Sequence, residues 1–285
     1  MPSETASPPV DRTVADIRRR VAAWRQASER IALVPTMGAL HEGHFALVRK
    51  ARDLADRVIV SVFVNPTQFA PTEDLESYPR NEDADRAALA RLGVDTVFAP
   101  SVEEIYPTGF ATSVAVAGPA EGLETEFRPY FLPGVATVVA KLFIACAPDS
   151  AIFGEKDYQQ LLVIRRMVTD LGIPVAIIAH PTVREADGLA LSSRNAYLSP
   201  DERQIAPGLH KSLNRAAAAI RAGAPIERVR SAAGADLRVA GFRVDYVDVR
   251  NAETLAPIID PKSEPLRLLA AAWLGKTRLI DNIPV

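Results

Sequence analysis

Two of the chain's four histidines, His41 and His44, lie three residues apart in a single turn. An apolar run at residues 31–34 precedes the turn and is typical of a buried parallel strand, and an amphipathic helical pattern follows it. Open α/β sheets bind ligands at the carboxyl ends of their strands, and a helix N-terminus favours phosphate. Gly38 and Gly43 would let a ligand approach the backbone closely. The turn therefore predicts a phosphate site with two imidazoles.

The histidine pair also allows two other interpretations. Both rings could be solvated polar residues of a tight turn, or they could bind zinc, which normally needs three or four protein ligands. The single cysteine, Cys146, is far away in sequence and lies in an apolar helical pattern typical of a packed core. No Walker loop occurs, because Ala270 stands where the first glycine before Gly275-Lys276-Thr277 would be needed, and G-x-G-x-x-G is absent. Nucleotide phosphates would therefore have to be bound by histidines and backbone amides.

A second polar turn follows the clearest strand pattern of the chain, the almost wholly apolar residues 58–64. Gln68 offers both hydrogen-bond donors and an acceptor, which suits a hydroxy acid or a carboxylate. Asn65 can brace the same loop. The alternative is ordinary turn chemistry, since Asn-Pro is itself a turn signal.

Two further segments carry cations that could contact phosphate. Lys156 follows a short strand at residues 151–153, and Gln160 lies one turn into the next helix. A helix N-terminus alone would explain the acids beside Lys156 but not the lysine. The polar connection around Ser192, Ser193 and Arg194 could form a mobile phosphate clamp, with arginine as the planar fork, or could be a plain loop.

The bulk composition is that of a globular protein of 285 residues, with 48% hydrophobic and 24% charged residues. A net charge of −2 argues against a general nucleic-acid surface, and no apolar run is long enough to span a membrane. Residues 1–12 are rich in Pro and Ser without an apolar core, which predicts a flexible tail rather than a signal peptide. We therefore expect a cytoplasmic protein.

Alternating strand and helix patterns predict an α/β domain with a parallel sheet over residues 13–181. A smaller α+β domain is expected over residues 182–285, with a boundary near Pro181. Its expected elements are helices at 201–222 and 226–239 and strands at 242–249, 266–274 and 277–280. The phase of the apolar pattern slips near Tyr246, which predicts a β-bulge there.

Taken together, four segments resemble the pantothenate synthetase (pantoate–β-alanine ligase) family. They are PTMGALHEGH at 35–44, VNPTQF at 64–69, FGEKDYQQ at 153–160 and DGLALSSRN at 187–195. The first resembles the HIGH signature of the nucleotidylyltransferases, and Ser-Ser-Arg resembles their KMSKS-like partner. The likeness extends over nearly the whole chain after residue 13.

This resemblance implies a Rossmann-like domain, a C-terminal lid and a homodimer, with ATP as a substrate and Mg²⁺ held mainly by the ATP phosphates. Pantoate would attack the α-phosphate to give pantoyl adenylate and pyrophosphate, and β-alanine would then displace AMP. Two steps make chemical sense because a bare carboxylate is a poor acceptor for an amine.

The resemblance also implies a role for individual residues. His41, His44 and Lys156 would be catalytic, with His44 as general acid, and Ser192 and Arg194 would clamp the leaving pyrophosphate. The implied ATP site comprises Met37, Gly38, His41, His44, Gly154, Lys156, Asp157, Val183, Leu191, Ser192, Ser193 and Arg194. Gln68 and Gln160 would bind pantoate with support from Asn65, and Gln68 would also contact β-alanine. No protein side chain is assigned to the metal.

The chain departs from the family pattern in one loop. Arg128-Pro129 is followed by Tyr130-Phe131 where relatives commonly carry a histidine, so the Tyr130 hydroxyl would replace it or the contribution would be lost. Leu191 in place of methionine conserves volume. Asp83 and Asp85 only partly match the acids found near Mg²⁺ in some relatives.

Three other functions compete with this assignment. Another nucleotidylyltransferase would share the histidine turn but would not need the pair Gln68 and Gln160. A non-enzymatic nucleotide-binding module would not need the two histidines together with Lys156 and Arg194. A zinc hydrolase is the third alternative.

Overall fold

The computed structural model describes residues 7–70, 73 and 75–285 and divides the chain into two compact units. The first unit takes in residues up to Val116, together with Arg128–Glu155 and Val163–His180. The second unit comprises Ala117–Phe127, Lys156–Leu162 and Pro181–Val285. The sequence pattern predicted only one boundary between the units, near residue 181. The segments 117–127 and 156–162 were not expected in the second unit, because in the sequence each is flanked on both sides by elements of the first unit.

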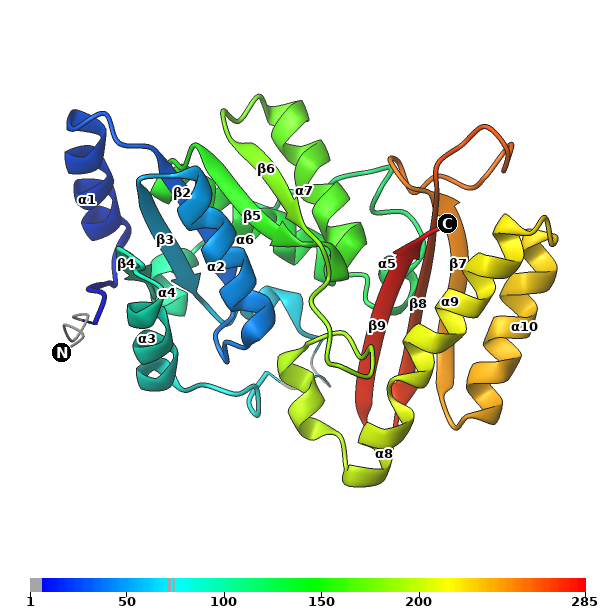
Figure 1. The fold of residues 1–285 in the computed structure, drawn as a ribbon. Coiled ribbons are helices and arrows are strands. Elements are labelled where there is room, and N and C mark those ends of the chain that lie inside the picture. Colours follow the sequence, from blue (N-terminus) through cyan, green and yellow to red (C-terminus); the bar gives the residue numbers. More distant parts are fainter. Residues whose placement is uncertain (1–6, 71–72, 74) are drawn as a thin grey trace. The chain divides into compact units, whose positions relative to one another are not determined.

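Within the described residues, the first unit contains a six-stranded parallel sheet of order β1-β4-β3-β2-β5-β6 (Figure 1). Its strands are β1 (Val10–Asp11), β2 (Ile31–Thr36), β3 (Arg57–Val62), β4 (Thr96–Phe98), β5 (Ser150–Gly154) and β6 (Ala176–His180). The central strand β2 is buried at four consecutive residues, as its apolar run requires when helices cover both faces of a sheet. The predicted Rossmann-like α/β fold is confirmed.

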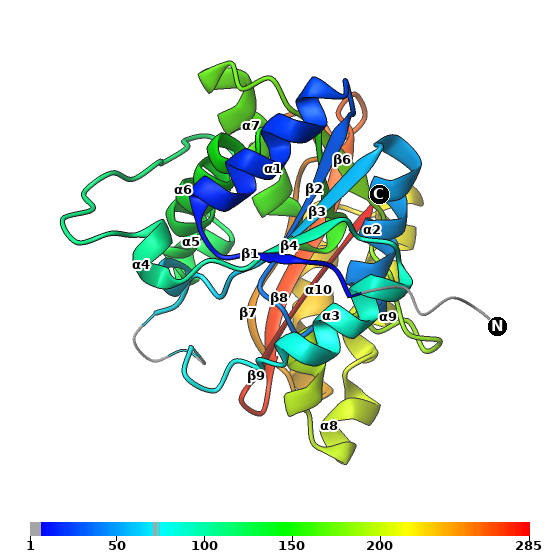
Figure 2. The same ribbon diagram turned by 90° about the vertical axis from the view of Figure 1, so that its left-hand side faces the viewer.

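Helices cover both faces of this sheet. Helices α1 and α6 lie on one side of it and α2 on the other (Figure 2). Leu47, Val48 and Ala51 of α2 pack against the buried valines of β2 and β3. The helices of the first unit are α1 (Val14–Gln26), α2 (Glu42–Leu54), α3 (Glu82–Arg91), α4 (Val102–Ile105) and α6 (Phe131–Cys146), with η1 (Pro66–Gln68). Helix α7 (Tyr158–Leu171) begins in the second unit and ends in the first.

The expectation of a flexible tail over residues 1–12 is wrong for Val10–Asp11. Residues 1–6 lie outside the described part of the chain, but Val10–Asp11 form the edge strand β1 beside β4. Asp11 is buried and binds the Arg20 guanidinium through Nε at 2.6 Å. Strand β1 is held by backbone pairing with β4 and by this ion pair, and not by buried apolar side chains. The segment therefore lacks the apolar pattern from which a strand is predicted.

The second unit contains an antiparallel sheet of order β7-β8-β9. Its strands are β7 (Arg243–Asn251), β8 (Leu266–Leu274) and β9 (Thr277–Pro284). Its helices are α5 (Glu124–Phe127), η3 (Ser193–Tyr197), α8 (Pro200–Ile205), α9 (Gly208–Arg221) and α10 (Ile226–Val239). The short helix η2 (Glu155–Asp157) has its first residue in the first unit and the other two in the second. The predicted bulge is confirmed, because the register shifts between Val244 and Tyr246. The single helix expected over 201–222 is wrong. Two helices form there, because Pro207 has no N–H to continue the first one.

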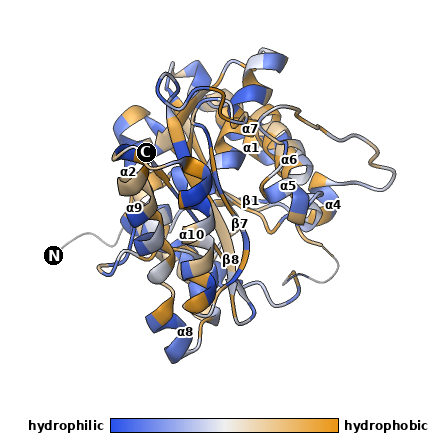
Figure 3. Cartoon of the chain, turned by 90° about the vertical axis from the view of Figure 1, so that its right-hand side faces the viewer, coloured by the Kyte–Doolittle hydropathy of each residue, from blue (hydrophilic) through white to orange (hydrophobic). Residues whose placement is uncertain are grey.

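The two faces of this small sheet have different coverings. Helices α9 and α10 cover one face with apolar residues that include Leu213 and Leu237, and their ribbons carry both hydrophilic and hydrophobic residues (Figure 3). On the other face Leu269 of β8 packs with Leu123 and Leu162, which come from the two short segments. These segments are therefore part of the second unit's core.

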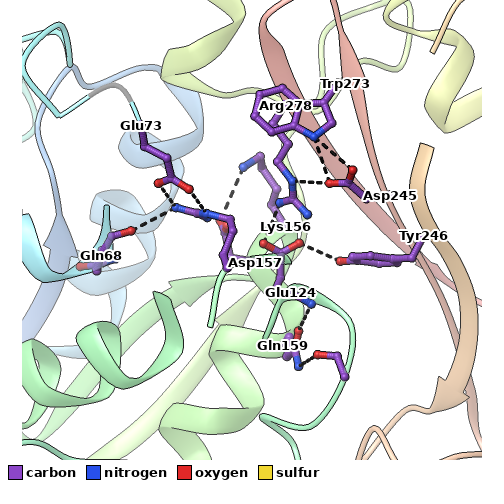
Figure 4. A network of polar contacts seen from close by, with 12 residues as sticks. Gln68, Glu73, Glu124, Lys156, Asp157, Gln159, Asp245, Tyr246, Trp273 and Arg278 are labelled. Atoms are coloured by element: carbon purple, nitrogen blue, oxygen red, sulfur yellow. Dashed lines mark hydrogen bonds and ion pairs between the residues drawn. The ribbon is translucent and has the colours of Figure 1, made fainter. Parts of the chain in front are cut away.

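A buried polar network fastens the first of these segments to the sheet (Figure 4). Arg278 of β9 donates to Glu124 at 2.7 Å through Nη1 and to Asp245 at 2.8 Å through Nε. The Tyr246 hydroxyl donates to Glu124 at 2.9 Å, and burial raises the pKa of Tyr246 well above its usual value. Removing one partner from such a network leaves an uncompensated buried charge, so the segment is held tightly.

Candidate active site

The two histidines of the 35–44 turn cap the N-terminus of α2. The Gly43 N–H donates to His41 Nδ1 at 3.1 Å, and the His41 N–H donates to His44 Nδ1 at 3.3 Å. The ring centroids are 4.1 Å apart. Because each Nδ1 accepts from a backbone N–H, each neutral ring must carry its proton on Nε2. The two rings therefore have the same tautomer, with Nε2–H as a hydrogen-bond donor.

The backbone before these histidines is held by a carboxylate from α3. Gly38 and Ala39 have left-handed φ angles of 82° and 51°. Asp85 accepts from the Ala39 and Leu40 N–H groups, each at 2.9 Å. Burial raises the pKa of Asp85, and these two hydrogen bonds oppose that effect. No local pattern reveals this role, since α2, β3 and η1 separate the carboxylate from the histidine turn in sequence.

The Asn65–Gln68 turn is a buried amide cluster. Asn65 donates through Nδ2 to Gln68 Oε1 at 2.9 Å and to the Gly134 carbonyl at 3.1 Å. Its Oδ1 accepts from the Tyr106 hydroxyl at 2.8 Å. Gln68 keeps two N–H donors on its terminal amide, which suits an anionic or hydroxylated ligand. Asn65 thus contacts Gln68 directly, as a bracing residue would.

Two contacts from the chain near α6 shape this turn. A Cβ placed on Gly134 would lie 2.4 Å from the Thr67 carbonyl oxygen, so only glycine fits there. Arg128 donates to Glu73 at 2.6 and 2.8 Å and to the Gln68 carbonyl at 3.1 Å. Neither Gly134 nor Glu73 was expected from the sequence to shape this turn. The sequence signal that could have indicated the close contact at Gly134 is a glycine inside a helical pattern.

The loop at residues 128–131, which departs from the family pattern, exposes one of its two aromatic rings. Tyr130 is 67% exposed, whereas the Phe131 ring lies 4.1 Å from the Arg128 guanidinium carbon. Phe131 therefore supports Arg128 by a cation–π contact.

In the second unit, the lysine turn precedes α7 (Figure 4). Lys156 Nζ lies 3.6 Å from Asp157 Oδ2. Next to it the buried Gln159 accepts from the Glu124 N–H and donates to the carbonyls of Pro119 and Gly122, at 3.0 to 3.2 Å. Gln160, the other predicted pantoate ligand, is half-buried on the same helix turn. The buried amide of Gln159 therefore fixes the turn that carries Lys156, Asp157 and Gln160.

The Ser-Ser-Arg segment is more ordered than the predicted polar connection. The Leu191 N–H donates to the Val183 carbonyl at 3.0 Å, and Arg184 and Ala190 form an antiparallel bridge. Ser192 caps η3 by accepting from the Arg194 N–H at 3.3 Å. A hydroxyl that accepts one hydrogen bond can still donate its own proton.

The predicted site residues divide between the two units. The first contains Met37, Gly38, His41, His44, Asn65, Gln68 and Gly154. The second contains Lys156, Asp157, Gln160, Val183, Leu191, Ser192, Ser193 and Arg194. Within the units, contacts join His41 to His44, Asn65 to Gln68, and Val183 to Leu191.

Two chemistries find little support in the described part of the chain. Cys146 is buried, and burial raises its pKa far above the usual value for a thiol, which disfavours a thiolate nucleophile. Among the described residues no three His, Cys, Asp or Glu side chains gather as metal ligands. The same residues include no helix that is long and apolar enough to cross a membrane.

Comparison with known proteins gives one consistent result. The family model for pantoate–β-alanine ligase matches residues 10–284. The pantothenate synthetase of Rhodopseudomonas palustris is 56% identical over 279 residues, covering 98% of this chain and 99% of the relative. That of Caulobacter vibrioides is 56% identical over 285 residues, with the same coverage of each chain.

Solved structures agree. The crystal structure of pantothenate synthetase from Thermus thermophilus is similar with a TM-score of 0.89 and 48% identity, covering 96% of this chain and 98% of the other. The pantoate–β-alanine ligase of Francisella tularensis, described as a complex with β,γ-ATP and β-alanine, has a TM-score of 0.81 and 33% identity, covering 97% of each chain. With the histidine turn and the amide cluster on the described fold, the chain belongs to the pantoate–β-alanine ligase family.

Proposed function

We propose that the turns described above carry out the reaction of this family in the present chain. Pantothenate synthetases join pantoate to β-alanine at the expense of ATP, through a pantoyl adenylate. Activation comes first because the adenylate provides AMP as a leaving group that the bare carboxylate lacks. The observation that carries the proposal is the pair of imidazoles at the N-terminus of α2, each of which accepts a backbone N–H through Nδ1.

In this proposal the histidine turn binds the phosphates that react. His41 and His44 donate through Nε2 to charge that develops on the phosphates during adenylate formation, and His44 acts as the general acid. Met37 and Gly38 contribute backbone to the ATP site. Asp85 keeps the turn in its left-handed conformation, so the donors are oriented before ATP binds.

The two glutamines bind pantoate. Gln68 and Gln160 satisfy its hydroxyls and carboxylate, Asn65 holds Gln68, and Gln68 also contacts β-alanine. Support comes from the hydrogen bond between Asn65 and Gln68, which orients the amide. A neutral amide suits this task because it offers donors and an acceptor without adding charge.

The cations and hydroxyls of the second unit bind the rest of ATP. Lys156 holds the α-phosphate, and Ser192, Ser193 and Arg194 clamp the pyrophosphate that leaves. Gly154, Asp157, Val183 and Leu191 line the nucleotide site. Arginine forms a planar fork that fits phosphate oxygens, which suits Arg194 to this role.

Mg²⁺ binds chiefly to the ATP phosphates and to water in this proposal. Mg²⁺ retains several waters in most nucleotide sites and needs few protein ligands. We further propose a cytoplasmic homodimer that does not bind nucleic acid, in keeping with a net charge of −2.

The test follows AMP and pyrophosphate with ATP, pantoate and β-alanine, each omitted in turn. ATP and pantoate alone should release pyrophosphate up to about one equivalent per site, because the adenylate stays bound until the amine arrives. No pyrophosphate before β-alanine is added would overturn the stepwise route. Pyrophosphate release without pantoate would point instead to a different nucleotidyl acceptor.

A further inference from the structure

Two consecutive residues of β9, Asp281 and Asn282, have buried side chains in the second unit, each 3% exposed. Successive side chains of a strand point to opposite faces of the sheet. Asp281 lies on the face covered by α9, and Asn282 on the face covered by the 156–162 segment. Neither residue belongs to the proposed site, yet each contacts a segment that carries site residues.

Asp281 fixes the hairpin that leads into the Ser-Ser-Arg segment. It accepts two hydrogen bonds from the Arg184 guanidinium, at 2.7 and 2.8 Å. Arg184 also donates to the Gly188 carbonyl at 3.1 Å and bridges to Ala190. A bidentate pair of this kind sets orientation as well as distance. The hairpin therefore enters residues 192–194 with a fixed direction.

A histidine on α9 supports the same carboxylate and the same hairpin. His210 Nδ1 lies 3.2 Å from Asp281 Oδ2. A Cβ placed on Gly188 would lie 2.9 Å from His210 Cδ2, so the imidazole packs directly on the hairpin backbone. Asp281 thus joins β9, α9 and the hairpin at one point.

Asn282 performs the matching task on the opposite face. Its Nδ2 donates to the Lys156 carbonyl at 2.9 Å, and its Oδ1 accepts from Arg267 Nε at 2.7 Å. The Arg267 guanidinium in turn lies 4.0 Å from the Tyr158 ring centroid. The main chain of the lysine turn is therefore bonded to β9 itself.

We propose that Asp281 and Asn282 are positioning residues, which together set the Ser192–Arg194 segment and the Lys156 turn in a fixed relation for adenylate formation. This inference rests on the proposed function, because it takes its effect from the phosphate contacts of those segments. A rigid strand is well suited to the task, since catalytic groups misplaced by about 1 Å can cost 100-fold in rate.

The test separates the two half-reactions. Asp281→Asn and Asn282→Asp nearly preserve side-chain shape but remove, respectively, the charge that holds Arg184 and the donor to the Lys156 carbonyl. Each should slow single-turnover pyrophosphate release by about 10- to 100-fold. The attack of β-alanine on pre-formed, enzyme-bound pantoyl adenylate should change by less than about threefold in Asp281→Asn, a small effect on the same scale, because the segment that Asp281 positions clamps pyrophosphate, which has already left. Asn282→Asp should slow this second step as well, because the α-phosphate that Lys156 holds remains in the adenylate.

Asp248→Asn is the matched control. Asp248 is also a buried carboxylate of this sheet, on β7, and it pairs with Arg250 and Arg230 rather than with a site segment. It should leave both half-reactions close to wild type after correction for stability. Equal slowing of both half-reactions by Asp281→Asn, or equal effects of Asp281→Asn and Asp248→Asn, would overturn the inference.

Hydrogen exchange provides a readout that does not depend on activity. Asp281→Asn should speed exchange at the Glu185 and Leu191 amides, which bond to Leu189 and Val183 across the hairpin. If Asp281→Asn does not fold, Arg184→Lys keeps the charge, loses the bidentate contact and should give the same pattern. Unchanged exchange in a folded variant overturns the positioning role, whereas a wild-type protein that releases no pyrophosphate overturns only the proposed reaction.

Discussion

The imidazoles of His41 and His44 each accept a backbone hydrogen bond through Nδ1, so one contact both caps α2 and selects the tautomer. In the proposed reaction, the Nε2–H groups of the same two rings are the donors to phosphate. In each histidine, Nδ1 therefore has the structural role and Nε2 the proposed catalytic role. A substitution that keeps an acceptor at the Nδ1 position but lacks Nε2 can test the two roles separately.

His44→Asn should be inactive but stable. The amide oxygen of asparagine can replace Nδ1 as the acceptor from the His41 N–H, whereas nothing replaces Nε2. Losing an oriented donor to developing charge typically costs about 100- to 1000-fold in rate. His44→Ala should lose the same activity and about 0.5–2 kcal/mol of stability as well, because the cap is lost. Single-turnover pyrophosphate release and urea unfolding measure the two effects, and an active His44→Asn would contradict the assignment.

Gln68→Ala and Gln160→Ala should raise the Michaelis constant for pantoate by at least about tenfold, because a buried polar group of the ligand is left unpaired at about 1–3 kcal/mol. ATP binding should be nearly unchanged, since its proposed contacts lie on other turns. Calorimetry with pantoate and with the non-reacting β,γ analogue of ATP distinguishes the two ligands. Equal losses for both would mean that the glutamines do not form a pantoate pocket.

At the scale of elements, Gly134 of α6 packs on η1 so closely that the helix cannot carry a side chain there. Alanine would favour an isolated helix by about 0.8–1.0 kcal/mol. The 2.4 Å approach to a backbone oxygen should outweigh that gain, because neither the helix nor the turn can swing away as a flexible side chain can.

Gly134→Ala should therefore lower the free energy of unfolding by about 1–3 kcal/mol and weaken pantoate binding through a displaced Asn65. Gly234→Ala, in α10, is the matched control. Its new Cβ would meet the mobile end of Arg238 at 3.3 Å, so helix propensity should raise stability by about 0.5–1 kcal/mol. Urea unfolding of both variants would show opposite signs. A stabilised Gly134→Ala would contradict the contact.

The elements that sequence predicted well are those whose patterns are local. Buried parallel strands such as β3 appear as apolar runs, and the bulge near Tyr246 appears as a slip in phase. The break at Pro207 was missed although proline is a local signal, because an Ala- and Arg-rich helical pattern continues on both sides. The roles of Asp85 and Asp281 arise from tertiary contacts between distant segments, and no spacing in the sequence encodes them.

For the second unit as a whole, acid should weaken the fold through Asp281. Burial alone would raise the pKa of this carboxyl, but hydrogen bonds from His210 and Arg184 outweigh burial and hold the pKa below its usual value. A carboxyl with a lowered pKa stabilises the fold above its unfolded-state pKa of about 3.9, and this contribution disappears as the pH falls through the folded value.

The difference in unfolding free energy between wild type and Asp281→Asn should therefore be largest near neutral pH and should shrink below about pH 4. Urea titrations of both proteins at several pH values measure it. A difference that grows on acidification would contradict the ion pair.

Leu123 and Leu162 form part of the second unit's core with Leu269 of β8, although the chain between them and β8 is more than a hundred residues long. During synthesis, both leucines leave the ribosome well before the strand that will bury them. The N-terminal portion must therefore wait with unsatisfied apolar surface until the strands at the end of the chain have emerged, which is the situation in which nascent chains aggregate or recruit chaperones. A premature stop after residue 180 would leave a fragment without β7, β8 and β9, so Leu123 and Leu162 would lose the sheet against which they pack.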